Sequence, residues 1–586
     1  MFRFNLPAVL AIVLGLVMRT QSAAWEGSAK PNIVIIMADD MGFDDVSFRG
    51  SNEFLTPNID ALAYSGVILN NLYTPSMCTP SRAALLTGKY PLNTGMQHYV
   101  LVNDQPWSLP TNETTMGEVF QENGYYTSLI GKWHLGMSRK AYTPKFRGFD
   151  QHYGYLGAYV DYYDQTLEQG NVNYSRGHDF RDNLRPVCDR NGTYVTDLLT
   201  EAAIRRIKQH NYQRKPLFML LSHLAPHSAN DDDPLQAPQS EVEKFSYIKD
   251  ERRRKYAAMV SKLDQSVGQV VEALSHRGIL NNTILLFLSD NGGPTQGMHS
   301  TTASNYPLRG QKHSPWEGGL RSSAAIWSTQ LEKLGTIWKQ KIYIGDFLPT
   351  LAAAANIPLD GLTLDGLNLW PSLKYGYESV EREIMHNIDE IFNYEVYAKG
   401  KWKFVNGTTV EGRYDGWLSQ RPNDSSQIDP RFEHYEDLVK QSPVWKHLHA
   451  ITGDKPIQLL EHREHAVVKC LYEDATLGVA CNPLEAPCLF DLDVDPCEQN
   501  NLYEKMKNST IFGDIMERIA YFREHAHPIN NKPADYRCNP ADFNYEWTWW
   551  EDVLEGNGGR GVKGKFSFLE LLGLTGLLVV LREVLD

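Results

Sequence analysis

Four short, continuous apolar runs constrain the fold more than any other feature of this sequence. Each run is five or six residues long and rich in Ile, Leu, Val or Phe. The runs are Asn32–Met37, Tyr126–Ile130, Leu217–Ser222 and Thr283–Leu288. Runs this short, with no polar residue at every second position, are typical of strands buried on both faces of a mostly parallel sheet.

Helical patterns separate these runs along the chain. They cover Pro57–Tyr64, Ser81–Leu86, Thr115–Asn123, Val195–Gln209 and Arg252–His276. Strands that alternate with helices in this way predict an α/β domain, in which helices flank a large, mostly parallel sheet.

Charged or ligating side chains follow each of the four runs. They lie in Ala38–Asp40, Gly131–His134, His223–His227 and Ser289–Gly293. In open α/β sheets, ligands bind beyond the carboxyl ends of the strands. We therefore expect these four segments to meet in one functional site.

The pattern changes beyond about residue 375, where short strands are joined by tight turns. The expected elements are Glu383–Asp389, Tyr394–Ala398, Trp402–Asn406 and Leu489–Leu492 as strands, Lys399–Lys401 as a hairpin turn, and Ile511–His527 as a helix. The sequence thus predicts a large domain over 25–374 and a smaller α+β domain with an antiparallel sheet over 375–550. A Gly-rich segment and an apolar tail follow over 551–586.

Residues 1–24 have the features of a cleaved secretory signal peptide. Arg3 supplies a positive charge, Leu6–Met18 is apolar but too short to span a bilayer, and Ser22–Ala24 offers small residues for cleavage. Asn-x-Ser/Thr sequons agree with secretion and predict a glycoprotein; they lie at Asn112, Asn173, Asn191, Asn281, Asn406, Asn423 and Asn508. We expect a lysosomal or extracellular protein of the secretory pathway.

Seven cysteines are present, and five of them fall in the last 120 or so residues. They are Cys78, Cys188, Cys470, Cys481, Cys488, Cys497 and Cys538. A secreted chain is expected to form disulfides, and an odd count leaves at least one thiol over. Cys78 stands alone in the first 187 residues and is the expected odd one. Cys488–Cys497 and Cys470–Cys481 are the local bridges that the spacing suggests.

The formal net charge is −14, which argues against a general nucleic-acid binder. It leaves room for a local basic pocket that binds one anion. The apolar stretch Phe566–Leu581 is short for a membrane span, and the charged residues after it fit poorly with a processed lipid-anchor signal. We therefore expect no membrane anchor.

Cys78 is the most distinctive candidate residue. Pro80 favours the first turn of a helix, so Cys78 is expected at or just before a helix N-terminus. The free N–H groups there favour an anion, such as a thiolate with a lowered pKa. Arg82 follows four residues later and is expected on the same face.

The segment Cys78-Thr-Pro-Ser-Arg82, followed by Leu86-Thr-Gly88, resembles the signature of the type I sulfatases. Other segments extend the resemblance from residue 31 to about 550: Ala38–Asp40, Gly131–Gly136, Asp290–Gly292 and Arg309–Lys312. The resemblance implies the alkaline-phosphatase-like fold. It also implies that the first large domain is catalytic.

Within that family the sequence is most similar to the arylsulfatase B type, the N-acetylgalactosamine-4-sulfatases, and to arylsulfatases I and J. The segments that carry this similarity are Leu86–Gly95, Arg147–Asp150, Pro307–Lys312 and Trp316–Arg321. One departure is clear, because two cysteines of the arylsulfatase B proteins are missing and residues 102–106 take their place. The disulfide framework and the outer pocket must therefore differ.

The resemblance implies that Cys78 is oxidised to formylglycine by the formylglycine-generating enzyme during secretion. The hydrated aldehyde would attack sulfur with one hydroxyl and release sulfate by re-forming the aldehyde. A serine would instead keep a stable sulfate ester. Covalent catalysis of this kind divides one difficult hydrolysis into two easier steps.

Hard oxygen ligands follow two of the strands: Asp39, Asp40, Asp290 and Asn291. This set suits Ca²⁺ or Mg²⁺ and not Zn²⁺. The resemblance implies a single Ca²⁺ that also contacts the formylglycine at position 78.

The resemblance also assigns roles to the remaining candidates. Lys132 and Lys312 would neutralise the sulfate, and Arg82 would hold the formylglycine side chain. His134 would take a proton from the diol, and His227 would protonate the leaving alcohol and contact substrate. His223, at the end of the same strand, is a rival to His227, and Asp290 is a candidate to deprotonate the attacking hydroxyl.

The sequence therefore predicts a sulfatase with sulfated glycans or small sulfate esters as substrates, and N-acetylgalactosamine 4-sulfate of dermatan or chondroitin sulfate as the expected group. Two alternatives stay open. One is a related metal-dependent phosphatase or phosphodiesterase in which Cys78 remains a thiol. The other is a glycan-binding protein that keeps the pocket without turnover.

Overall fold

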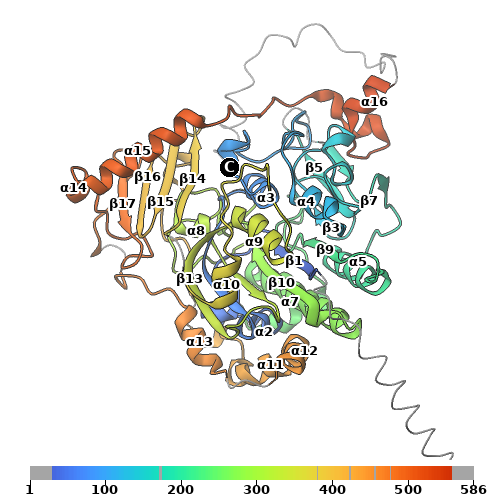
Figure 1. The fold of residues 1–586 in the computed structure, drawn as a ribbon, viewed down its shortest axis with the longest axis horizontal. Coiled ribbons are helices and arrows are strands. Elements are labelled where there is room, and N and C mark those ends of the chain that lie inside the picture. The colour runs from blue at the N-terminus through green and yellow to red at the C-terminus, as the bar shows by residue number, and fades with distance from the viewer. Residues whose placement is uncertain are drawn as a thin grey trace, which may run out of the picture.

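A computed structural model describes residues 30–170, 175–378, 381–421, 424–453, 457–474 and 477–556. Figure 1 shows a large sheet with helices packed around it and a smaller sheet, β14 to β17, at one side of the molecule. The predicted signal peptide, the sequons at Asn173 and Asn423, and residues 557–586 of the predicted tail lie outside the described residues.

Five parallel strands form the centre of an 11-stranded sheet, in the order β10, β1, β9, β3 and β4. Their bounds are Thr283–Ser289, Asn32–Ala38, Leu217–Ser222, Tyr126–Lys132 and Gln151–Tyr155. β1, β9 and β10 are buried along their whole length. The predicted buried, parallel strands are confirmed.

The edges of this sheet are largely antiparallel, so the sheet as a whole is mixed. β12 (Ala324–Trp327) pairs antiparallel with β10 and with β2 (Val67–Tyr73). β13 (Thr336–Tyr343) runs parallel to β2. On the opposite edge, β7 (Arg181–Asp182) pairs antiparallel with β4.

Two groups of helices pack around the large sheet. The first contains α2, α5 and α7, which contact one another pairwise (α5 with α7, α2 with α7); their bounds are Pro57–Ser65, Val195–Gln209 and Glu251–His276. The second contains α3, α4 and α9, with bounds Cys78–Thr87, Met116–Glu122 and Phe347–Ala354. The α/β architecture with flanking helices is confirmed.

The smaller sheet is antiparallel, in the order β14, β15, β16 and β17, as expected. Its strands are Glu383–Asp389, Tyr394–Lys399, Trp402–Asn406 and Cys488–Asp491, and α15 (Thr510–His525) contacts β14 and β15. Helices α11 (Tyr435–Gln441) and α12 (Pro443–Thr452) pack instead on α2. The domain limits proposed from the sequence remain predictions.

The cysteine pairing differs from the expected local bridges. Cys470 is bonded to Cys497, and Cys481 to Cys488. The expected pairs Cys488–Cys497 and Cys470–Cys481 are therefore wrong, because the fold brings Cys470 to Cys497, which lies 27 residues further along the chain. Three cysteines are unpaired and not one: Cys78 and Cys538 are buried, and Cys188 is exposed.

Five of the predicted sequons fall on described residues. Asn112, Asn191, Asn281 and Asn508 are exposed, whereas Asn406 is half-buried and donates to Glu395 Oε1 at 3.2 Å. Glycosylation of the exposed four remains a prediction. Among the described helices, none combines the length and the apolar character needed to span a bilayer.

Candidate active site at the strand ends

The ends of the four predicted central strands bring the candidate residues together. β1 pairs in parallel with β10, with Ala38 opposite Ser289, so Asp39 and Asp290 leave the sheet side by side. Lys132 is the last residue of β3, and the turn after β9 carries His227. The side chains of these residues are all buried.

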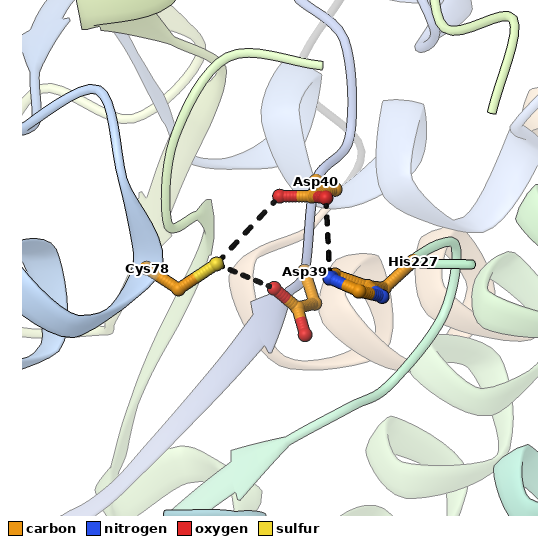
Figure 2. Close-up of side chains that lie close together, drawn as sticks. All are labelled: Asp39, Asp40, Cys78 and His227. Carbon is orange, nitrogen blue, oxygen red and sulfur yellow. Dashed lines mark hydrogen bonds and ion pairs between the residues drawn. The ribbon is translucent and has the colours of Figure 1, made fainter. Parts of the chain in front are cut away.

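Cys78 is the first residue of α3 and faces two carboxylates. Its Sγ atom lies 3.7 Å from Asp39 Oδ1 and 3.8 Å from Asp40 Oδ1 (Figure 2). Donor atoms of Asp39, Asp40, Cys78 and His227 lie within 4.8 Å of one another. The start of α3 therefore places the Cys78 side chain directly beside Asp39 and Asp40, the carboxylates that follow β1 and that we call the acidic strand end.

The expectation of a lowered pKa at Cys78 is wrong for the thiol. Burial raises its pKa to about 12, and the carboxylates of Asp39 and Asp40 also raise it, against the opposing effect of Lys132 and Lys312. Desolvation of the charged form outweighs the favourable helix N-terminus. An unmodified Cys78 is thus a neutral thiol in this pocket.

Two lysines that lie far apart in the sequence pair with Asp39 and Asp40. Lys132 Nζ lies 2.7 Å from Asp39 Oδ2, and Lys312 Nζ lies 2.6 Å from Asp40 Oδ2. Burial opposes the charge of Lys312, but Asp40 more than compensates and raises its pKa above the usual value. Both cations are held at the carboxylates next to Cys78.

Arg82 lies one helical turn after Cys78 and pairs with two carboxylates of the site. Its Nη2 atom is 2.8 Å from Asp290 Oδ2 and 3.5 Å from Asp39 Oδ1, while Nη1 donates to Ser222 Oγ at 2.6 Å. The Arg82 side chain is only 2% exposed. It is therefore fixed between the ends of β1, β9 and β10.

Asn291 and Asp290 complete the acidic strand end. Asn291 Nδ2 donates to Asp40 Oδ1 at 2.6 Å, and the Asp40 backbone N–H donates to Asp290 Oδ1 at 3.2 Å. Asn291 Oδ1 is buried and makes no hydrogen bond to any described residue. Its free oxygen and the three nearby carboxylates form a donor set suited to a hard divalent cation.

His134 has a defined proton arrangement. Its Nε2–H donates to the carbonyl of Leu101 at 2.8 Å, so Nδ1 is left as an acceptor, and this buried atom has no partner in the described part of the chain. Burial, with Lys132 and Arg82, lowers its pKa well below the usual value. His134 is therefore a neutral imidazole with an available lone pair.

The structure separates His227 from its rival His223. His227 Nε2 lies 3.4 Å from Asp40 Oδ2, and its Nδ1–H donates to the carbonyl of Ser228 at 2.6 Å. His223 instead faces α7, with Nε2 2.9 Å from Ser266 Oγ. Only His227 of the two reaches the acidic strand end.

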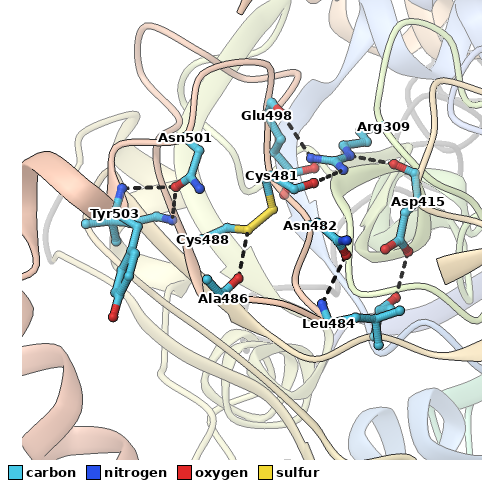
Figure 3. Close-up of a disulfide and its surroundings, with 12 residues drawn as sticks. Arg309, Asp415, Cys481, Asn482, Leu484, Ala486, Cys488, Glu498, Asn501 and Tyr503 are labelled. Carbon is cyan, nitrogen blue, oxygen red and sulfur yellow. Dashed lines mark hydrogen bonds between the residues drawn. A yellow bond between two sulfur atoms is a disulfide. The ribbon is translucent and has the colours of Figure 1, made fainter. Parts of the chain in front are cut away.

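The loop that carries Lys312 is anchored by Arg309. The Arg309 guanidinium donates to three backbone carbonyls from the C-terminal part of the chain (Figure 3). These belong to Asp415, Cys481 and Glu498, at 2.6, 3.2 and 3.4 Å. The Cys481–Cys488 disulfide thus lies next to the contacts that hold the lysine loop.

Two residues that the sequence did not single out also line this site. The ring of Tyr159 stacks on His227 at 5.4 Å, and His299 lies 5.7 Å from the same ring. His299 stands eight residues after Asn291 in an irregular loop, and Tyr159 stands in another. Neither loop carries a spacing pattern from which these contacts could be predicted.

Comparison with known proteins agrees with this geometry. The family model described as Sulfatase matches residues 31–357. Arylsulfatase J of Mus musculus is 35% identical over 533 residues, which cover 90% of this chain and 81% of that protein. Arylsulfatase A of Homo sapiens is 33% identical over 354 residues, which cover 58% and 68%.

Solved structures give the same result for the fold. A crystal structure of Ps i-CgsB in complex with k-i-k-neocarrahexaose matches with a TM-score of 0.65 and 25% identity, over 90% of this chain and 98% of that one. In sequence, the chain is also similar to N-acetylgalactosamine-6-sulfatase of Mus musculus. The two are 28% identical over 61% of this chain and 68% of that protein. With its alkaline-phosphatase-like fold and its strand-end site, this chain belongs to the sulfatase family of sulfuric ester hydrolases.

Proposed function

We propose that this enzyme hydrolyses the sulfate ester of a sulfated sugar, with N-acetylgalactosamine 4-sulfate of dermatan or chondroitin sulfate as the candidate group. The catalytic group would be a formylglycine made from Cys78, beside one Ca²⁺. One observation carries the proposal. Cys78 lies within 4 Å of two carboxylates whose other oxygens hold Lys132 and Lys312.

The charges of the pocket support a divalent cation. Three carboxylates, of Asp39, Asp40 and Asp290, face three cations, of Arg82, Lys132 and Lys312. These charges cancel, so an anionic sulfate ester would find no net attraction. A bound Ca²⁺ would supply the missing positive charge.

The candidate ligands are Asp39, Asp40, Asp290 and Asn291, with position 78 beside them. The orphaned Asn291 Oδ1 supports this set, because buried polar atoms without partners are rare. With the cation on the carboxylates, Lys132 and Lys312 would be free to turn their ammonium groups to the sulfate oxygens. Preorganised positive charge of this kind stabilises the developing transition state.

A hydrated formylglycine at position 78 would supply the hydroxyl for attack on sulfur. Arg82 would fix the side chain at position 78 through the carboxylate of Asp39, which both residues contact, and Asp290 would take the proton of the attacking hydroxyl. His134 Nδ1 is the acceptor for the second hydroxyl proton when sulfate leaves.

His227 is the proposed acid for the leaving group. When the sulfur–oxygen ester bond breaks, the alcohol oxygen would take a proton from His227 Nε2, while Nδ1–H stays bonded to Ser228. The sum of the steps consumes one water and yields the alcohol and hydrogen sulfate. Burial lowers the pKa of His227 well below its usual value, while the nearby carboxylate of Asp40 opposes that shift and favours the protonated imidazole that this step needs.

Mass spectrometry of the peptide from Tyr73 to Arg82 tests the modification, in protein made by a eukaryotic secretory pathway. We expect an aldehyde at position 78. A thiol in every molecule would contradict the mechanism. The Cys78→Ser variant is expected to fold and to lose repeated turnover, since its sulfate ester cannot break down.

Turnover of an aryl sulfate and an aryl phosphate by the same preparation separates the proposal from a phosphatase. We expect release of sulfate from the aryl sulfate and no release of phosphate from the aryl phosphate. Chondroitin 4-sulfate and 6-sulfate disaccharides then test the sugar, and release from the 6-sulfate only would overturn the 4-sulfate assignment. A preparation that binds both disaccharides but releases no sulfate would favour the glycan-binding alternative.

Secretion and its partner are part of the same proposal. The formylglycine-generating enzyme must meet the chain during secretion, and the predicted signal peptide over 1–24 would deliver it there. N-terminal sequencing of the secreted protein is expected to begin near residue 25. A lysosomal or extracellular destination agrees with both.

A further inference from the structure

Two groups of rings stand next to the catalytic residues. The first consists of Tyr159, His227 and His299, with ring centroids 5.2 to 5.7 Å apart. The second begins at His313, the neighbour of Lys312, whose ring lies 5.4 Å from that of Tyr99. Since His227 and Lys312 belong to the site, rings flank it on two sides.

The two groups meet through Tyr99 and Met298. The Tyr99 hydroxyl lies 3.5 Å from Met298 Sδ, and Met298 precedes His299. Met298 is 36% exposed, and Tyr99 and His299 are half-buried. This set reaches from the buried pocket to the surface, so we call Tyr99, Met298, His299, His313 and Phe392 the ring collar.

The C-terminal sheet contributes one member of the collar. Phe392 follows β14, and its ring lies 5.2 Å from His313 and 6.1 Å from Tyr99. Asp389, the last residue of β14, accepts the backbone N–H of Phe392 at 2.9 Å and pairs with His98 at 2.9 Å. Phe392 is therefore held in place by the end of a strand.

The backbone of the collar is strained in the same way as that of the catalytic residues. Tyr99, His299 and His313 have φ of 51°, 54° and 69°, and Asp40 and His134 have 63° and 59°. Bulky residues rarely adopt this left-handed region, and such strain is concentrated at ligand sites. Three collar members and two residues of the active site thus adopt the same rarely populated backbone conformation.

The chemistry of the collar suits a sugar ring. Flat aromatic faces pack against the C–H faces of a pyranose, while imidazole and phenol groups can hydrogen-bond its hydroxyls. His313 Nε2 is buried without a partner among described residues, which leaves one such group available. The collar itself contains no Lys, Arg, Asp or Glu, so it would recognise the alcohol part of the ester and not its sulfate.

We propose that the ring collar is the subsite for the sugar that carries the sulfate group, and that it sets the preference for glycan over aryl esters. The inference rests on the proposed sulfate ester hydrolysis. It goes further in naming the residues that hold the leaving sugar. Tyr99 and His299 are its specificity residues, because they stand on opposite flanks and join through Met298.

The test compares kcat/KM for the chondroitin 4-sulfate disaccharide with kcat/KM for 4-nitrophenyl sulfate. The variants Tyr99→Asn and His299→Asn remove a ring but keep a residue that tolerates a positive φ. We expect the disaccharide-to-aryl ratio to fall about tenfold in each, the usual size of one ring contact. Tyr99→Phe, which keeps the ring, is expected to restore most of the ratio.

Tyr375→Ala is the matched control, because Tyr375 is an exposed aromatic on α10 (Trp370–Tyr375) whose ring lies under the ammonium of Lys374. Its ratio is expected to match the wild type. An equal loss on both substrates in the Asn variants would show a merely structural role and overturn the inference, as would an unchanged ratio.

Calorimetric titration of the disaccharide into the same variants keeps the two proposals distinguishable. If the wild type binds the disaccharide but does not turn it over, the catalytic proposal fails. Weaker binding in Tyr99→Asn and His299→Asn would in that case still support the collar. Unchanged binding together with an unchanged ratio would overturn the collar while sulfate hydrolysis stands.

Discussion

The ion pairs of the buried Lys403 ammonium are expected to be among the contacts outside the active site whose loss lowers stability most. Lys403, on β16, lies 3.0 Å from Glu317 Oε1 and 2.7 Å from Glu498 Oε1, and the three side chains are fully buried. Glu317 begins α8 (Glu317–Leu320), just after the loop of Lys312. The triad therefore ties the small sheet to the loop that carries Lys312.

The Lys403→Met variant keeps the volume and removes the charge. Two buried carboxylates then lack their cation, and breaking a buried pair in this way costs about 3–5 kcal/mol of unfolding free energy. The Tyr73 hydroxyl, which donates to Glu317 Oε2 at 2.9 Å, covers only part of that loss. We expect a clearly lower thermal midpoint.

The loss should grow with pH. Burial raises the pKa of Glu498 to about 7, from 4.5, and Lys403 opposes that rise. Without Lys403 the pKa climbs further. Between the unfolded and the folded pKa, the folded protein holds a proton that the unfolded chain has released, so stability falls as pH rises through this window.

Thermal unfolding at about pH 5 and about pH 8 measures this difference. The double variant Lys403→Met/Glu498→Gln is expected to recover part of the loss at the higher pH, because only one carboxylate remains. Lys401→Met is the control, since Lys401 pairs with Asp491 at the surface and should matter little. A Lys403→Met variant as stable as wild type at the higher pH would refute the reasoning.

Three further results are expected. His227→Asn should lower kcat at least ~100-fold, the usual worth of a general acid, and His223→Asn should lower it much less; equal losses would contradict the assignment. Chelation of divalent cations should lower the thermal midpoint, and added Ca²⁺ should restore it; no shift on either step would argue against a bound cation. Non-reducing peptide mapping should recover Cys470–Cys497 and Cys481–Cys488, and recovery of Cys488 with Cys497 would contradict the structure.

The centre of the fold was predictable because burial on both faces leaves a strong signal. The runs that became β1, β3, β9 and β10 contain no charged residue, and the structure places them within two residues of the predicted limits. β2 (VILNNLY) and β13 (TIWKQKIY) carry polar residues and were missed. Their partners at the sheet edge decide their conformation, and partners are not visible in a local pattern.

The site divides in the same manner. Residues at strand ends, such as Asp39 and Asp290, could be placed from the rule that parallel strands end at one edge. Tyr99, His299 and Phe392 come from three irregular loops, and only the folded chain brings their rings together. The thiol of Cys78 shows a different limit, since its burial, which reverses the expected pKa shift, is a property of the whole fold.

The hydrogen bonds from Arg309 to the carbonyls of Asp415, Cys481 and Glu498 limit how far this enzyme can be truncated. A fragment cut after residue 357 would retain every candidate cation ligand. It would lack the anchors of its second lysine, so the minimal working catalyst must extend well beyond the span that defines the family.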